Sequence, residues 1–263
     1  MASTLFVVTG ASRGLGREVA VTLGRRIEVL KEAKPFFVLL ARGAEGLKAT
    51  KEQILSVSPN AEVLTQSVDL SKVPACSDTL REAIETISSG QTFKNAILVN
   101  NAGIIKPLTP LLQVKHTDFM ESFSLSVLGP LELLKAFNKV NSQKKTVVHI
   151  SSIMALMPKD SCGVYGSVKA ASDAMHRSLA KEESETYRVV NYSPGPMDTD
   201  MMTEISTDHP DTYERAMWRE ARQSAIRPED SARKLMYLLE RNEYKNGAHI
   251  DIYDLDEDGE IIR

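Results

Sequence analysis

The chain alternates between short apolar runs and longer segments in which apolar residues recur with helical spacing. The apolar runs are nearly continuous, which is the pattern of parallel strands that helices cover on both faces. We predict strands at 5–9, 36–41, 62–67, 96–100, 146–151, 189–193 and 249–254, and helices at 14–30, 45–57, 75–88, 118–140, 164–185 and 228–241. This order predicts an α/β fold with a Rossmann-type, doubly wound sheet of seven parallel strands.

No Pro/Gly/Ser-rich linker and no internal repeat interrupts the 263 residues, so we expect a single domain over 1–263. The segment 201–224 departs from the alternation, because it is polar, contains methionines and separates the sixth strand from the last helix. Loops of this length inside a compact domain are usually functional. One that follows the carboxyl end of a strand can cover a ligand, so we expect a substrate lid at 201–224.

Composition and charge exclude several classes of protein. Hydrophobic residues make up 42% and charged residues 25%, which is typical of a globular protein. A net charge of −3 and the lack of a long apolar stretch give no reason to expect nucleic acid or a membrane as a partner. An apolar run that starts at Leu5 leaves no room for a secretory leader, which favours a cytoplasmic location. The two cysteines and five histidines show no ligand spacing, so no metal site is expected.

A glycine-rich turn lies between the first predicted strand and the first helix. Its residues of interest are Gly10, Ser12, Arg13, Gly14, Leu15 and Gly16. The glycines allow a tight turn and a close approach to a pyrophosphate, whose charge the N–H groups at the helix start can meet. The turn lacks the Lys-Ser/Thr ending of a P-loop, so its position favours a dinucleotide over a nucleoside triphosphate.

Two arginines favour a phosphorylated dinucleotide. The second predicted strand ends at Arg42, where an NAD enzyme places a carboxylate that holds the ribose 2′-hydroxyl. The guanidinium groups of Arg42 and Arg13 suit a 2′-phosphate, so we expect NADP(H) as the cofactor. Solvated surface charges are the alternative interpretation of both side chains.

Other strand ends carry small or polar residues that suit the rest of the dinucleotide. They are Asp69, Asn101, Ala102 and Gly103 for the adenine and its ribose, and Pro194, Gly195 and Thr199 for the nicotinamide. Asp, Asn, Gly and Pro also favour turns. Purely structural roles for these residues therefore stay open.

A tyrosine and a lysine four residues apart begin the helix predicted at 164–185. Tyr165 and Lys169 share a helix face, and an ammonium near a phenol favours the phenolate, which lowers a pKa of ordinarily about 10. Ser152 ends the preceding strand, where its hydroxyl can donate to the same carbonyl oxygen that Tyr165 protonates. Together they predict a catalytic site with Tyr165 as the general acid.

In order and spacing these features resemble the short-chain dehydrogenase/reductase family over essentially the whole chain. The matching segments are TGASRGLG at 9–16, Asp69, NNAG at 100–103, Ser152, YGSVK at 165–169 and PGPMDT at 194–199. The resemblance implies an NADP-dependent oxidoreductase in which Tyr165 protonates a substrate carbonyl that Ser152 orients. It also implies that Lys169 binds the nicotinamide ribose, lowers the Tyr165 pKa and lies with Tyr165 against the cofactor.

Within that family the second half of the chain is most similar to the sepiapterin reductases, through residues 146–152, 191–201 and 246–254. This similarity implies a pterin substrate with a side-chain ketone, as in tetrahydrobiopterin biosynthesis, and implies that Asp251 binds the pterin guanidino edge. From the residues alone, an Asp at a strand end can equally cap a turn.

Several alternatives stay open. The enzyme can be a carbonyl reductase of other ketones, or the chain can be an idle NADP(H)-binding regulator, although an intact Ser152, Tyr165 and Lys169 argue against the regulator. Many family members carry a helix Asn that holds a water for proton relay. Either Ser126 replaces it here, or the Asn lies in a different register. The family commonly pairs the helices at 118–140 and 164–185 between subunits, so we expect a homodimer, with a tetramer as the alternative.

Overall fold

The computed structural model describes residues 3–30 and 34–262, with the side chains of 27–30 left aside. Its sheet has seven strands in the order β3-β2-β1-β4-β5-β6-β7, and every neighbouring pair is parallel. The strands are β1 (Thr4–Thr9), β2 (Pro35–Ala41), β3 (Glu62–Ser67), β4 (Phe93–Asn100), β5 (Ser142–Ile150), β6 (Tyr187–Ser193) and β7 (Ala248–Asp251). The predicted doubly wound fold is confirmed.

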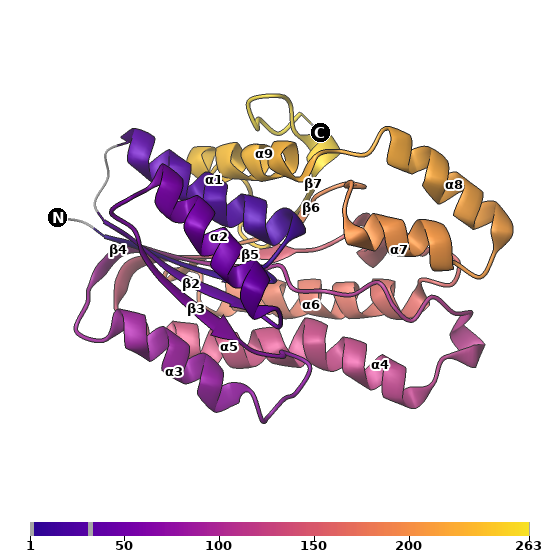
Figure 1. Cartoon of the computed structure of the whole chain (residues 1–263), viewed down its shortest axis with the longest axis horizontal. Coiled ribbons are helices and arrows are strands. Elements are labelled where there is room, and N and C mark those ends of the chain that lie inside the picture. The colour runs from indigo at the N-terminus through magenta and orange to yellow at the C-terminus, as the bar shows by residue number, and fades with distance from the viewer. Residues whose placement is uncertain (1–2, 31–33, 263) are drawn as a thin grey trace.

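Helices cover both faces of the sheet (Figure 1). The first layer contains α1 (Gly14–Leu30), α2 (Ala44–Val57) and α9 (Pro228–Arg241), and the second contains α3 (Ser77–Ser88), α4 (His116–Phe123), α5 (Gly129–Asn138) and α6 (Gly163–Glu182). Strand residues alternate between the two cores: Phe6 and Val8 pack with the first layer, whereas Leu5 and Val7 pack with the second. Burial on both faces is the reason that the strand sequences are apolar throughout.

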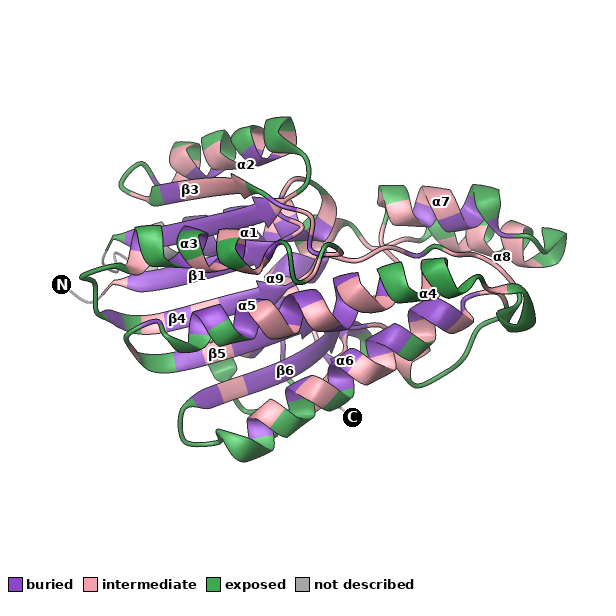
Figure 2. Cartoon of the chain, turned by 90° about the horizontal axis from the view of Figure 1, so that it is seen from below, coloured by how far each residue is buried: buried purple, intermediate pink, exposed green. Residues whose placement is uncertain are grey.

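Segment 201–224 is helical rather than an irregular loop. It forms α7 (Asp200–Asp208) and α8 (Thr212–Gln223), which project beyond the carboxyl ends of the strands (Figure 2). The Asp211 carboxylate caps α8 by accepting the N–H groups of Tyr213 and Glu214. Met202 and Ile205 are buried on the face of α7, but α8 has no buried residue among its twelve. The α8 segment is polar overall, and a polar stretch between predicted elements was interpreted as a loop although its few apolar residues recur with helical spacing.

Two other predicted elements differ from the structure in the kind of secondary structure that they contain. The helix expected at 118–140 contains a π-helical turn, Ser124–Leu128, between α4 and α5. Beside that turn, a Cβ atom at Gly129 would lie 2.7 Å from the Leu70 carbonyl oxygen. The strand expected at 249–254 ends at Asp251 and continues as a 3₁₀ turn, Ile252–Asp254. π-helical turns are frequent at functional sites, and this one packs against α6.

The chain reverses its direction of travel across the sheet between β1 and β4. It builds β1, β2 and β3 toward one edge and then returns beside β1 to build β4 to β7 toward the other. In open α/β sheets a ligand crevice forms outside the carboxyl ends of the strands at such a point.

In the part of the chain described, no helix is long and apolar enough to cross a membrane.

Candidate active site

A cavity of about 1190 Å³ opens along the carboxyl ends of all seven strands. This volume exceeds the roughly 300–1,000 Å³ of a pocket for one drug-sized ligand, so the cavity has room for a cofactor and a substrate together. Every site residue predicted from the sequence lines it, except for Gly16 and the open case of Ser126. Ser126 is buried in the π-helical turn.

The glycine turn has the shape that a pyrophosphate site requires. Gly10 and Gly14 have φ values of +64° and +54°, in the left-handed region that favours glycine. Gly16 lies beneath the turn, where an added Cβ would clash with the Gly10 carbonyl oxygen and the Asn101 amide. The Asn101 Nδ2 donates to the Thr9 carbonyl oxygen at 2.9 Å, so Asn101 holds the turn in place.

Arg42 and Asp69 lie together at the end of the cavity formed by β2 and β3. Ser71 donates its N–H and hydroxyl to the Asp69 carboxylate at 3.0 and 2.8 Å. Partial burial acts to raise the pKa of Asp69, but these hydrogen bonds and the Arg42 charge outweigh it, and the pKa is lowered. Asp69 is therefore ionised, and Arg42 supplies positive charge beside it.

Arg13 has an acidic partner within the protein. Its guanidinium lies 2.5 Å from the Asp200 carboxylate at the start of α7, and both side chains are about 70% exposed, at 70% and 69%. The pair joins the glycine turn to α7 across the rim of the cavity. Such an exposed pair contributes little stability, so the Arg13 guanidinium is free to exchange its partner for a phosphate.

The turn after β6 packs against the glycine turn. Gly195 has a φ of +75°, and an added Cβ would come within 2.7 Å of the Ile226 side chain. The methyl group of Thr199 lies 3.6 Å from where a Cβ on Gly14 would stand. Its hydroxyl makes only a long 3.4 Å hydrogen bond to the Met197 carbonyl oxygen. Thr199 therefore lies beside the glycine turn and lines the same cavity.

Ser152, Tyr165 and Lys169 meet at the other end of the cavity. Burial raises the pKa of the Tyr165 phenol to about 12, although a hydrogen bond with Ser152 acts to lower it. The Lys169 Nζ lies 5.7 Å from the centre of the Tyr165 ring and donates to the Ile150 carbonyl oxygen at 2.6 Å. This differs from the expectation that Lys169 brings the Tyr165 pKa below its ordinary value, because desolvation dominates in so closed a position.

Lys169 is itself strongly affected by burial. Desolvation lowers its pKa to about 8, while the charge of Asp173, one helical turn further along α6, acts to raise it. At pH 7 the ammonium is protonated but lies close to its titration point. Tyr165 in turn carries its proton at any physiological pH, which is the state that a general acid needs.

Asp251 caps a turn and also lines the cavity. One carboxylate oxygen accepts the N–H of Tyr253 at 3.0 Å and so caps the 3₁₀ turn, and the other accepts the Ser193 hydroxyl at 2.6 Å. The residue also lines the cavity. Each carboxylate oxygen has a second lone pair, so these contacts leave Asp251 able to accept from a ligand.

The apolar wall around Tyr165 was not predicted from the sequence. Its members line the cavity and pack in one cluster with Tyr165; they are Met154, Met201, Met202, Ile205 and Trp218. Their convergence depends on α7 and α8 folding over the ends of the strands, and the helical nature of 201–224 was the missing signal.

The residues present fit a phosphorylated nicotinamide dinucleotide. A Cβ at Gly16 would clash with the glycine turn. The start of α1 lines the cavity at Gly14 and Leu15, where helix N–H groups can meet the charge of a pyrophosphate. Arg42 lies at one end of the cavity, and Tyr165 and Lys169 lie at the other. The residues that would hold this cofactor are Gly10, Gly14, Arg42, Thr199 and Lys169.

Comparisons with known proteins agree with this geometry. Residues 4–210 match the family model described as short chain dehydrogenase. The chain is 36% identical over 262 residues to sepiapterin reductase of Xenopus laevis, covering 97% of both chains. It is 29% identical to benzil reductase ((S)-benzoin forming) of Bacillus subtilis, covering 96% of this chain and 98% of that protein. The crystal structure of the KRED1-Pglu enzyme superposes with a TM-score of 0.78 at 24% identity, over 94% of this chain and all of that one, and so shares the fold. The chain therefore belongs to the short-chain dehydrogenase/reductase family.

Proposed function

We propose that this protein reduces a ketone on the side chain of a pterin with NADPH. The observation that carries the proposal is a buried, protonated Tyr165 beside Ser152 and Lys169, at one end of a cavity whose other end presents Arg42. The membership of an oxidoreductase family and the similarity to sepiapterin reductases support it.

The protein's own residues orient the substrate and supply a proton. Bound NADPH would supply the hydride. The Ser152 and Tyr165 hydroxyls converge on the position of a substrate carbonyl oxygen, which Tyr165 protonates as negative charge develops on it. A phenol with a pKa raised to about 12 carries its proton at neutral pH, but burial also makes it a weaker acid, so proton donation needs a positive charge that stabilises the phenolate. Lys169 places a positive charge behind the phenol and stabilises the phenolate that remains.

The pterin is favoured by the donor and acceptor groups at the substrate end. A pterin offers a flat ring with a donor edge, its 2-amino and N3–H groups, and the Asp251 carboxylate can accept both. Trp218 and the methionines around Tyr165 supply an apolar wall of aromatic and polarisable side chains for the ring. The similarity to benzil reductase favours a second candidate, a carbonyl reductase of aromatic diketones. An idle regulator is a third, and it would leave Ser152, Tyr165 and Lys169 without a task.

We also propose that α7 and α8 form the lid of the substrate site. Lys106 lies 3.1 and 3.0 Å from the carboxylates of Glu204 and Asp208 on α7, and Asp200 pairs with Arg13. These ion pairs are exposed and contribute little stability, so opening the segment would chiefly cost the packing of Met202 and Ile205 against Tyr165. A homodimer, which the family resemblance implies, and a cytoplasmic location are part of the same proposal.

The substrate class can be tested by following the loss of NADPH absorbance during turnover. The alternative substrates are sepiapterin, benzil and a small aliphatic diketone, and differences of about 10-fold in kcat/KM correspond to about 1.4 kcal/mol in transition-state free energy. We expect the highest kcat/KM with sepiapterin. A clear preference for benzil would favour the second candidate, and no turnover with any carbonyl compound, despite tight NADPH binding, would favour the regulator.

The cofactor assignment predicts a change in selectivity for Arg42→Asp. This variant loses a charge-assisted contact with the 2′-phosphate and gains a repulsion, so the ratio of the NADPH to NADH dissociation constants should rise by at least about 10-fold. Both cofactors are titrated against both proteins. Arg81→Asp on α3 makes the same change in charge outside the cavity lining and should leave the ratio unchanged. An unaltered ratio in Arg42→Asp would show that this side chain does not read the phosphate.

A further inference from the structure

A row of polar side chains crosses the sheet directly beneath Lys169. Asn100 of β4 is in register with His149 of β5, His149 with Asn191 of β6, and Asn191 with His249 of β7. Residues in register on parallel strands point to the same face of the sheet. Leu98, Val147 and Val189 form the apolar row two residues earlier on this face, so the polar row is a local departure from an otherwise apolar core.

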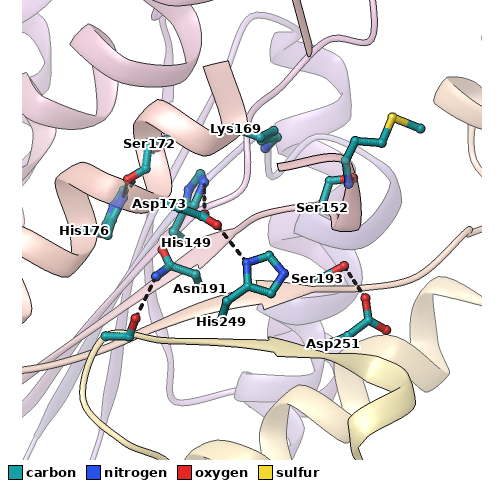
Figure 3. A network of polar contacts seen from close by, with 12 residues as sticks. His149, Ser152, Lys169, Ser172, Asp173, His176, Asn191, Ser193, His249 and Asp251 are labelled. Atoms are coloured by element: carbon teal, nitrogen blue, oxygen red, sulfur yellow. Dashed lines mark hydrogen bonds and ion pairs between the residues drawn. The ribbon is translucent and has the colours of Figure 1, made fainter. Parts of the chain in front are cut away.

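Helix α6 covers this row with polar groups of its own. Asp173 Oδ2 lies 2.7 Å from His249 Nδ1, and its Oδ1 lies 3.6 Å from His149 Nε2. His176 stacks on His149 with the ring centres 4.6 Å apart, and its Nε2 lies 3.1 Å from Asn100 Nδ2. Figure 3 shows the Asp173 carboxylate pointing toward the His249 imidazole, with Lys169 on the same helix.

The cluster is almost wholly removed from solvent. Asp173 is 1% exposed, His149 2% and Lys169 3%. A buried carboxylate is costly unless it has a charged or hydrogen-bonding partner. The His249 contact supplies one hydrogen bond, and Lys169, four residues earlier on the same helix face, supplies the opposite charge.

His149 and His176 cannot take the place of either charge. Burial lowers the pKa of His176 to about 4 and that of His149 well below its ordinary value, so both rings are neutral at working pH. Tyr165, on the same face of α6, is protonated and neutral. The titratable groups around Lys169 come from α6, β5 and β7. Asp173 is the one carboxylate among them, and the others are Tyr165, His176, His149 and His249.

We propose that Asp173 is a positioning residue for Lys169: oriented by His249, its carboxylate is the nearby counter-charge that keeps the buried ammonium protonated behind Tyr165, while the Ile150 carbonyl oxygen accepts the ammonium's hydrogen bond. The inference rests on the proposed function, because it concerns the lysine of that site. It goes beyond that function by giving the site a charged support that runs from α6 to β7. Strand β7 carries both His249, which contacts Asp173, and Asp251, which lines the cavity. The same strand therefore lies next to Asp173 and to the proposed substrate site.

The proposal predicts a shift in the pH profile. The pKa of Lys169 lies at about 8 in the native protein, with burial lowering it and Asp173 raising it. Since Lys169 acts as the ammonium, kcat/KM should fall as the pH rises through about 8. Asp173→Asn keeps the shape and removes the charge, so the Lys169 pKa should drop and the alkaline limb of kcat/KM should move to lower pH by about 1 unit or more.

Conservative variants separate charge from packing. Asp173→Ser also removes the charge but leaves space for a water, so it serves the same test if the amide does not fold. Asp173→Glu keeps the charge and should retain the alkaline limb near its native position. Ser172→Ala, at a fully buried neighbour on α6, should leave the limb unmoved. A limb that stays in place in a folded neutral variant, or that moves equally in Asp173→Glu, would overturn the proposal.

A second readout does not depend on turnover. In protein labelled with ¹³Cε-lysine, the Lys169 resonance is identified by its loss in Lys169→Arg and is titrated directly. It should titrate near pH 8 in the native protein and at lower pH in Asp173→Asn. If the native protein reduces no carbonyl compound, the proposed function fails, and this titration still decides the role of Asp173: a shift supports it, and an unshifted resonance contradicts it.

Discussion

Tyr165→Phe is expected to lower kcat/KM for carbonyl reduction by at least about 100-fold, the effect of losing a general acid. The phenol is the buried, protonated donor of the site, since its pKa is raised to about 12. Phenylalanine keeps the ring that packs with Met202 and Ile205, so the fold and the affinity for NADPH should be retained. Steady-state kinetics and a fluorescence titration with NADPH measure the two properties separately.

Tyr187→Phe is the matched control for this prediction. Tyr187 is also buried, but it begins β6 at the opposite end of the strand from the cavity, where its hydroxyl donates to Asn138 at 2.9 Å. Loss of that hydroxyl should affect thermal stability and leave kcat/KM near the native value. Near-native turnover in Tyr165→Phe, with the control also active, would remove Tyr165 from the proton-transfer step.

Asp251→Asn is expected to reduce kcat/KM for sepiapterin selectively. In the proposed complex the carboxylate would accept both donors of the pterin edge, and loss of charge-assisted hydrogen bonds costs about 2–3 kcal/mol, or roughly 30- to 150-fold in kcat/KM. Asparagine is isosteric, its Oδ1 can still accept the Tyr253 N–H, and the 3₁₀ turn should therefore persist. A small aliphatic diketone has no such donor edge, so its reduction should change little.

The two-substrate comparison decides between the roles of Asp251. Asp256→Asn is a useful control, because Asp256 caps the next turn by accepting the N–H groups of Asp258 and Glu260 and does not line the cavity. Equal losses on both substrates in Asp251→Asn would indicate a structural role. An undiminished rate with sepiapterin would eliminate the pterin anchor.

The fold and most of the site could be predicted from local patterns. Continuous apolar runs such as 36–41 predict strands buried on both faces, and glycines at 10 and 14 predict a turn in the left-handed region. The spacing of Tyr165 and Lys169 places both on one helix face without knowledge of the rest of the chain. In each case the determining interaction lies within a few residues, so the sequence carries the information.

Long-range contacts account for what the sequence did not reveal. The helices at 201–224 depend on Met202 and Ile205 packing against Tyr165, and the high Tyr165 pKa depends on desolvation by the completed wall. Local spacing predicted the opposite direction for that pKa, because it contains the Lys169 charge but not the loss of water.

The support of the catalytic lysine shows the same division. The sequence by itself determined that Lys169 and Asp173 share a helix face, since they are four residues apart. His149 and His249 come from β5 and β7, which are far apart along the chain. Only the tertiary structure decided that both residues meet that helix face in one row of the sheet. Strand register is set by the packing of the whole sheet, and burial of the cluster makes its charges interact strongly because water no longer screens them.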